Sequence, residues 1–216
     1  MNRPPYVAVL ASLAISVSLF LIVSRSCKKS AARYAATQAH QVVGAGVAEE
    51  LAKRTGGKAA IVILSPGAGW ESNAVFQTPV QDFQRAALQH KGLEILATEP
   101  VNFGGAHTPQ PLFSGQEFSA MLAKYPEADT FVSFAGPPAL TAVQASEIKQ
   151  KQIHLIIVER RVTTGLKELL TERLVECAIE LRTPPGDVVK APRTPAEWFT
   201  HYWQVITPDT ASSLPN

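Results

Sequence analysis

The first apolar run of the chain is uncharged over nineteen positions, residues 6–24. As a helix rising about 1.5 Å per residue it would be about 28 Å long, close to the ~30 Å hydrocarbon core of a bilayer. Arg3 precedes the run, and a basic cluster follows it: Arg25, Lys28, Lys29 and Arg33. A cleaved secretory segment is usually shorter and ends in small residues. The pattern therefore predicts an uncleaved transmembrane anchor over residues 6–24, behind a short tail, residues 1–5.

After the anchor, apolar positions recur with the three- and four-residue spacing of an amphipathic helix over residues 30–54. Its apolar face is formed by Ala35, Ala39, Val42, Val43, Val47 and Leu51. Gly56-Gly57 supplies a left-handed stop. Residues 25–57 are therefore predicted to be a basic juxtamembrane segment followed by an amphipathic helix.

Two glycines lie inside this helix, in the triplet Gly44-Ala45-Gly46. Such a triplet could indicate a nucleotide-binding loop, but that motif follows a strand and this one does not. We interpret it as a site of close helix packing.

Five apolar, β-branched runs follow within residues 58–207: Ala60–Ser65, Leu93–Thr98, Thr130–Phe134, Ile153–Glu159 and Val175–Leu181. Several are apolar at consecutive positions, which is typical of strands covered on both faces. Helix starts lie between them, at Thr78-Pro79-Val80-Gln81, Ser114-Gly115-Gln116-Glu117 and Thr194-Pro195-Ala196-Glu197. The alternation predicts an α/β domain, a five-stranded parallel doubly wound (flavodoxin-like) sheet with helices on both faces. Residues 208–216, rich in Pro and Ser, are predicted to be a flexible tail.

The anchor carries small residues at every fourth position: Ala8, Ser12 and Ser16. A stripe of this kind lets a second transmembrane helix approach closely, so that packing and hydroxyl hydrogen bonds drive association. The alternative is that Ala and Ser are simply tolerated facing lipid. The uncharged run predicts contact with the lipid bilayer. The stripe predicts a second partner, which would be another membrane-protein subunit or a second copy of the chain.

Two signals for the orientation of the anchor oppose each other. More basic residues lie on its C-terminal side, which by the positive-inside rule places the domain in the cytoplasm. A short N-terminal tail with one Arg and a free amine is instead the usual start of an exporting signal anchor. We expect a single-pass protein of the inner (cell) membrane with its soluble domain periplasmic, or otherwise extracytoplasmic.

Net charge and the two cysteines exclude few classes of binding partner or modification. The formal net charge is +2, and the basic excess lies mostly beside the anchor, where it suits anionic lipid better than nucleic acid. We expect no nucleic-acid partner. Cys27 and Cys177 are far apart in the sequence, so no disulfide between them is expected. Cys27 is also a lipidation candidate, although Ser24-Arg25-Ser26 does not match the small, uncharged stretch of bacterial lipoprotein signals.

Several segments resemble type I periplasmic binding proteins and sugar-responsive repressor sensor domains: Ala60–Ser65, Pro79–His90, Gly92–Leu96, Tyr125–Val132, Gly165–Leu170 and Val175–Ile179. The resemblance covers about residues 58–185 and implies a ligand-binding α/β lobe. That family closes two lobes over a ligand, whereas this chain has length for one. A shared cleft would then need a second chain or a partner.

Ligands of open parallel sheets bind beyond the carboxyl ends of the strands. The loop after the first predicted strand is the strongest candidate. Gly67 and Gly69 permit tight backbone approach, Trp70 offers a stacking face, and Ser72 and Asn73 offer hydrogen bonds. The alternative is a surface loop whose Trp70 packs on the adjacent helix.

Two residues at later strand ends complete the candidate ligand-binding set. Arg160 could hold a carboxylate or phosphate, since guanidinium donors fork onto such anions, although such a residue more often belongs to an exposed ion-pair network. Glu99 ends the second predicted strand, about where a dinucleotide-binding fold places its ribose-binding acid, and Gly67-Ala68-Gly69 follows the first. Against that reading, Ser72 replaces the third glycine, and the helix predicted from Pro79 is too distant to aim its N-terminus at a pyrophosphate.

Signatures of catalysis or metal binding are missing from the sequence. The five histidines have no metal-ligand spacing, and neither a nucleophile elbow nor an HExxH motif occurs. We expect no catalytic residue, no metal and no cofactor. The aromatic cluster Trp198, Phe199, Tyr202 and Trp203 is predicted to lie on the last helix, as core packing or as a docking surface.

These features predict a membrane-anchored, non-catalytic binding or structural subunit whose domain associates with other membrane proteins. Two alternatives stay open. One is an enzyme that uses a nucleotide cofactor bound at the Gly67–Gly69 loop, and the other is a small-ligand sensor.

Overall fold

The computed structural model describes residues 38–102, 113–159, 165–182 and 192–214. Among these residues, none of the helices combines the length and the apolar character needed to cross a membrane. The predicted anchor with its small-residue stripe, Cys27 and Arg160 lie outside the described residues. The chain divides into two compact units, Met1–Gln38 and Ala39–Asn216.

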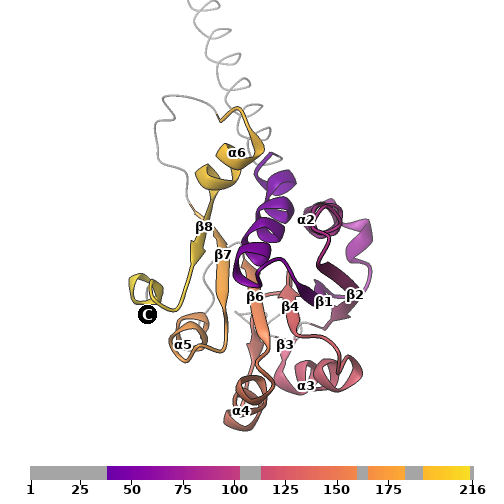
Figure 1. Ribbon diagram of the computed structural model, residues 1–216, viewed down its shortest axis with the longest axis vertical. Helices are drawn as coiled ribbons and strands as arrows, with labels where there is room; N and C mark the ends of the chain where they lie inside the picture. Colours follow the sequence, from indigo (N-terminus) through magenta and orange to yellow (C-terminus); the bar gives the residue numbers. More distant parts are fainter. Residues whose placement is uncertain (1–37, 103–112, 160–164, 183–191, 215–216) are drawn as a thin grey trace, which may run out of the picture. The chain divides into compact units, whose positions relative to one another are not determined.

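Six strands form the main sheet, in the order β2-β1-β4-β6-β7-β8 (Figure 1). They are β1 (Ala59–Pro66), β2 (Leu93–Val101), β4 (Thr130–Ser133), β6 (His154–Glu159), β7 (Cys177–Leu181) and β8 (Trp203–Ile206). The first five are parallel and have the flavodoxin-like order, so the predicted α/β class and its five parallel strands are confirmed. β8 pairs antiparallel with β7 and is a sixth strand that the sequence prediction missed.

Alternate residues of the central strands enter two different hydrophobic cores. In β1, Ile61 and Ile63 belong to one core and Val62 and Leu64 to the other, and all four are fully buried. Strands covered on both faces need apolar side chains at consecutive positions. This double burial explains the uninterrupted apolar runs of the sequence.

Helices cover both faces of the sheet (Figure 1). One face is covered by α3 (Gly115–Lys124), α4 (Ala142–Lys151) and α5 (Leu166–Thr171), and the other by the helical segment 38–54, α2 (Ala74–Ala87) and α6 (Pro195–Tyr202). A small parallel sheet pairs β3 (Phe113–Ser114) with β5 (Pro138–Ala139). The helical segment, predicted as part of a separate juxtamembrane region, is therefore an integral layer of the domain.

Helix starts agree with the capping signals except in α2. The Ser114 hydroxyl accepts from the Glu117 amide at 3.1 Å, and Thr194 forms a complete capping box with Glu197. α2 begins at Ala74, not at Thr78, and contains Pro79. The predicted start was wrong because proline is favoured in a first turn but is also tolerated further in, at the cost of a hydrogen bond.

The helical segment 38–54 crosses α2 at Gly44. A Cβ atom at Gly44 would lie 2.3 Å from the Phe83 backbone nitrogen and 2.4 Å from the Pro79 carbonyl oxygen. One residue on, the Ala45 amide donates to the Asp82 carboxylate at 3.0 Å, and burial raises the pKa of Asp82. The interpretation of the glycine triplet as a site of close helix packing is confirmed.

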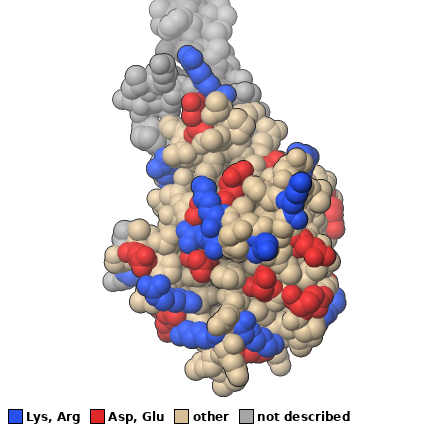
Figure 2. Space-filling model, viewed as in Figure 1, with Lys and Arg blue, Asp and Glu red and all other residues tan. Residues whose placement is uncertain are grey.

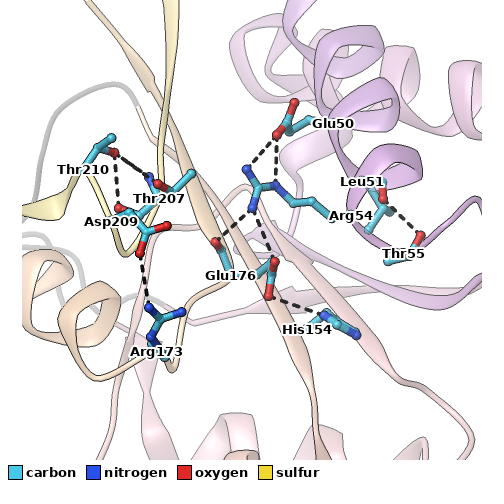
Figure 3. Close-up of polar contacts among 10 residues, drawn as sticks. All are labelled: Glu50, Leu51, Arg54, Thr55, His154, Arg173, Glu176, Thr207, Asp209 and Thr210. Atoms are coloured by element: carbon cyan, nitrogen blue, oxygen red, sulfur yellow. Dashed lines mark hydrogen bonds and ion pairs between the residues drawn. The ribbon is translucent and has the colours of Figure 1, made fainter.

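A cluster of ion pairs fastens the end of the helical segment to the amino edge of the sheet (Figure 3). Arg54 donates from Nε and Nη2 to Glu50 Oε1, at 2.9 and 2.7 Å, and from Nη1 to Glu176 Oε1 at 3.3 Å. Glu176 directly precedes β7, and its other oxygen lies 3.6 Å from Nδ1 of His154, the first residue of β6. These charges lie at the opposite edge from the carboxyl ends of the strands.

The C-terminal residues differ from the prediction. Residues 208–214 pack on the domain through the short helix η2 (Ala211–Ser213), with Ala211 and Leu214 buried. Lys167 Nζ donates to the Leu214 carbonyl at 3.0 Å, and Arg173 lies 3.2 Å from Asp209 (Figure 3). The prediction of a flexible tail is therefore wrong for these residues, because two apolar side chains anchor a segment whose composition is typical of a loop.

Candidate ligand-binding edge of the sheet

The strand order reverses at β1, which has β2 on one side and β4 on the other. In open parallel sheets, the crevice beyond the carboxyl ends at such a point is the usual binding site. Two described loops follow the strands at this point, residues 67–73 after β1 and residues 134–137 after β4. The first contains five of the residues predicted to bind ligand.

The loop after β1 is a closed turn with a defined backbone. Gly67 and Gly69 have φ angles of 67° and 80°, in the left-handed region that favours glycine. The Gly67 amide donates to the Val101 carbonyl at 2.9 Å, which ties the loop to the end of β2. The Ser72 hydroxyl donates to the Gly69 carbonyl at 2.7 Å, so the turn is also closed internally.

Trp70 is buried and packs in the core beneath the helical segment and α2, with 8% of its surface exposed. The sequence predicts this packing as the alternative to ligand binding. It leaves little of the indole ring exposed for a ligand to stack on. Ser72 and Asn73 are exposed beside it. The Asn73 carbonyl accepts from the Phe76 and Gln77 amides, so this residue also starts α2. A ligand-binding role for the loop stays a prediction.

Two buried hydroxyls at this edge were missing from the predicted set. Ser65, near the end of β1, donates to the Glu99 carbonyl at 3.3 Å, and Ser133, at the end of β4, donates to the Gly136 carbonyl at 2.6 Å. Both side chains are fully buried. Each is a polar residue closing an apolar strand, which is the sequence signal that could have found them. Their hydrogen bonds tie the ends of β1 and β4 to neighbouring backbone.

Glu99 is held by α3 rather than by the loop after β1. Its Oε1 accepts from Lys124 Nζ at 2.7 Å and from the Tyr125 hydroxyl. The hydrogen bond from Lys124, followed by that from Tyr125, lowers the pKa of the Glu99 carboxyl below its ordinary value. The structure therefore gives Glu99 a role in joining β2 to the C-terminal end of α3.

Replacing Glu99 by glutamine is expected to lower the free energy of unfolding at neutral pH by about 1 kcal/mol, because a charge-assisted pair becomes a neutral one. A carboxyl whose folded pKa is lowered stabilises the protein above its unfolded pKa and loses that effect as pH falls through the folded value. The stability difference between wild type and variant should therefore shrink towards acid pH in urea unfolding experiments. A difference that is constant or grows as the pH falls would contradict this role.

The two described loops carry few ionisable side chains. Glu71 is the sole ionisable side chain of the two loops, 67–73 and 134–137. Over the part of the chain that the structure describes, no three His, Cys, Asp or Glu side chains are grouped as a metal site would require. Cys177 is buried in β7, and burial raises the pKa of its thiol to about 12. Besides Glu71, the polar groups of these two loops are backbone, hydroxyl and amide groups.

One objection to the dinucleotide-binding alternative is removed by the structure. Because α2 begins at Ala74, its N-terminus directly follows the glycine loop instead of lying several residues beyond it. The second objection stands, since Ser72 occupies the position of the third glycine.

The sheet order and the two helical layers give a doubly wound α/β fold that is similar to solved structures of periplasmic binding proteins. No protein-family model matches the sequence, and no curated protein matches it significantly. Solved structures do match. AraP, an arabinose-binding protein from Geobacillus stearothermophilus, has a TM-score of 0.57 at 13% identity, over 82% of this chain and 63% of that chain.

Two further structures are similar. GanP, a glucose-galactose binding protein from Geobacillus stearothermophilus, has a TM-score of 0.53 at 18% identity, over 82% of this chain and 62% of that chain. The fructose binding periplasmic domain of a hybrid two component system has a TM-score of 0.54 at 15% identity, over 81% of this chain and 58% of that chain. The predicted fold resemblance is thus confirmed. The chain spans about three fifths of the length of the structures it matches.

Proposed function

We propose that this protein is a membrane-anchored, non-catalytic binding or structural subunit whose single lobe associates with other membrane proteins. The observation that carries the proposal is a sugar-binding-protein fold present over about three fifths of the length of such proteins. In this proposal the carboxyl edge of the lobe is the surface that meets a protein partner.

Two further features support the proposal. The loops 67–73 and 134–137 offer hydrogen-bonding groups and one ionisable side chain, Glu71, which suits recognition more than chemistry. The uncharged run over residues 6–24 has the length of a membrane span. A periplasmic domain among the similar structures favours an extracytoplasmic position for this one.

Association through the anchor can be tested by replacing Ser12 with leucine. The bulkier side chain would separate two helix backbones packed along Ala8, Ser12 and Ser16, and association should weaken by about 1–2 kcal/mol. Membrane insertion should persist because leucine is at least as apolar as serine. Co-purification of the full chain with its membrane partners in mild detergent is the measurement.

Ser24→Leu, which lies off the stripe, is the matched control and should leave co-purification unchanged. Equal recovery of partners with both variants would mean that the stripe faces lipid, and association would then have to reside in the domain.

Two alternatives each rest on one observation. A small-ligand sensor is favoured by the similarity to the fructose binding periplasmic domain of a two component system. An enzyme with a nucleotide cofactor is favoured by the start of α2 directly after the Gly67–Gly69 loop. A rise in melting temperature with a nucleotide that is abolished by Gly69→Trp would identify the enzyme with a nucleotide cofactor.

A further inference from the structure

Helix α6 carries a stacked pair of aromatic side chains at its surface. Trp198 and Tyr202 lie one helical turn apart, with ring centroids separated by 5.4 Å and ring planes within 10° of parallel. Both side chains are half-buried, and every residue of α6 keeps some surface exposed. Phe199 and Tyr202 also pack against the core, whereas Trp198 is held on the ring of Tyr202. The helix therefore presents Trp198 beside the core rather than within it.

This pair lies at the carboxyl end of the sheet, where the helical segment also begins (Figure 1). Trp203, the residue after α6, pairs with Leu181, the last residue of β7. Its indole N–H donates to the Ala39 carbonyl at 2.8 Å. The helical segment ends at the opposite edge, where Arg54 binds Glu176. The chain therefore enters the domain beside α6, at the carboxyl edge.

The length of chain between the predicted anchor and this entry point is short. The last anchor residue, Ser24, precedes the helix predicted from residue 30 by six positions, about 20 Å of chain even when fully extended. Ala39 lies nine positions further, which is about 14 Å of helix. Arg54, at the other edge of the sheet, is about 22 Å of helix beyond Ala39. If the anchor spans a bilayer, the carboxyl edge and α6 are the end of the domain nearest to that bilayer.

The charges of α6 are compatible with a bilayer surface. Glu197, the sole carboxylate of the helix, is engaged at its own helix start, where Oε2 accepts from the Arg193 amide at 2.6 Å. The Arg193 side chain is exposed there, and Arg182 donates to the His201 carbonyl at 3.0 Å at the other end. Guanidinium groups at both ends suit phosphate headgroups. Acidic and basic side chains are interspersed over the face drawn in Figure 2, so the aromatic pair, and not a large basic patch, distinguishes α6.

We infer that α6 is a membrane-contact helix whose Trp198–Tyr202 pair lies in the headgroup region of the lipid bilayer. Tryptophan and tyrosine are enriched at that depth because each ring is largely apolar, while its N–H or O–H group stays hydrated. The inference rests on the anchor of the proposed function and deepens that proposal. It directs the carboxyl edge towards the membrane, so a protein that binds this edge would lie at the bilayer surface.

Tryptophan fluorescence of the full chain, reconstituted in vesicles of phosphatidylcholine and phosphatidylglycerol, tests this contact. The quencher is a phosphatidylcholine with brominated acyl chains, which quenches tryptophans that touch the bilayer. The other two tryptophans of the chain, Trp70 and Trp203, are buried, with 8% and 3% of their surface exposed. Wild-type emission should therefore be quenched through Trp198. Trp198→Phe, which keeps an aromatic ring against Tyr202, should lose the quenched component.

Trp70→Phe is the matched control and should keep the quenched component, and flotation of the same vesicles reports membrane anchoring separately. A chain that floats with the vesicles but shows no quenching, or equal quenching in wild type and Trp198→Phe, would overturn the membrane contact and leave the anchor standing. In that case a protein would be the occupant of the aromatic surface. A chain that does not float would contradict the anchor, and with it both the proposed function and this inference.

Discussion

Replacing Gly44 by alanine is expected to destabilise the domain by about 3 kcal/mol, although alanine is the better helix former by about 1 kcal/mol. The added methyl would meet the Phe83 backbone nitrogen at 2.3 Å and the Pro79 carbonyl oxygen at 2.4 Å. Backbone atoms cannot rotate away, so the two helices must separate and strain the hydrogen bond from Ala45 to Asp82. For a domain of this size the melting temperature should fall by about 10 °C.

Gly46→Ala is the graded comparison for this variant. A methyl at Gly46 meets the ring of Phe199, a side chain that can turn, so its cost should be clearly smaller. Thermal unfolding followed by circular dichroism measures both. A stability for Gly44→Ala equal to that of wild type would contradict the close helix crossing on which this face of the domain is built.

Phe118→Ala is expected to cost about 3–5 kcal/mol, a large share of the total stability of a typical domain. Phe118 of α3 is fully buried, with its ring centroid 5.3 Å from that of Phe131 and 6.1 Å from that of Phe113. Truncation leaves a cavity between α3 and the sheet and removes two edge-to-face contacts. Urea unfolding should show a lower midpoint with an unchanged slope.

Val143→Ala is the control for this variant, since Val143 on α4 is 79% exposed and its truncation should change stability by about 0.5 kcal/mol or less. A similar, small effect of both substitutions would mean that α3 is not packed on the sheet as described.

The parallel sheet was predictable because its strands are buried on both faces. Runs such as Ile61–Leu64 contain no polar side chain, whereas a strand with one face in solvent would alternate apolar and polar residues. β8 was not predictable by the same logic. Its four residues directly follow α6, and Trp203 continues the aromatic spacing of that helix, so the pattern was assigned to one longer element. In the structure Trp203 is buried instead, and its indole N–H donates to the Ala39 carbonyl at 2.8 Å.

The carboxyl edge of the sheet was predictable from the sequence, whereas the contacts of the individual candidate residues were not. Parallel topology alone locates the carboxyl edge, and positive φ angles at Gly67 and Gly69 agree with the turn proposed there. The burial of Trp70 and the partners of Glu99 depend on which helix packs beside each residue. That information is tertiary, and local spacing does not contain it.

The most direct test of the central claim, that this lobe binds proteins rather than an enclosed small ligand, is a thermal-shift screen of the full chain. The panel would contain monosaccharides, nucleotides and NAD(P). A ligand bound by the native state alone adds about 2.7 kcal/mol at 100 times its dissociation constant, which is about 5–10 °C for a domain of this size. We expect an unchanged melting temperature throughout, and a rise of that size with any sugar or nucleotide would instead show that the lobe binds a small ligand.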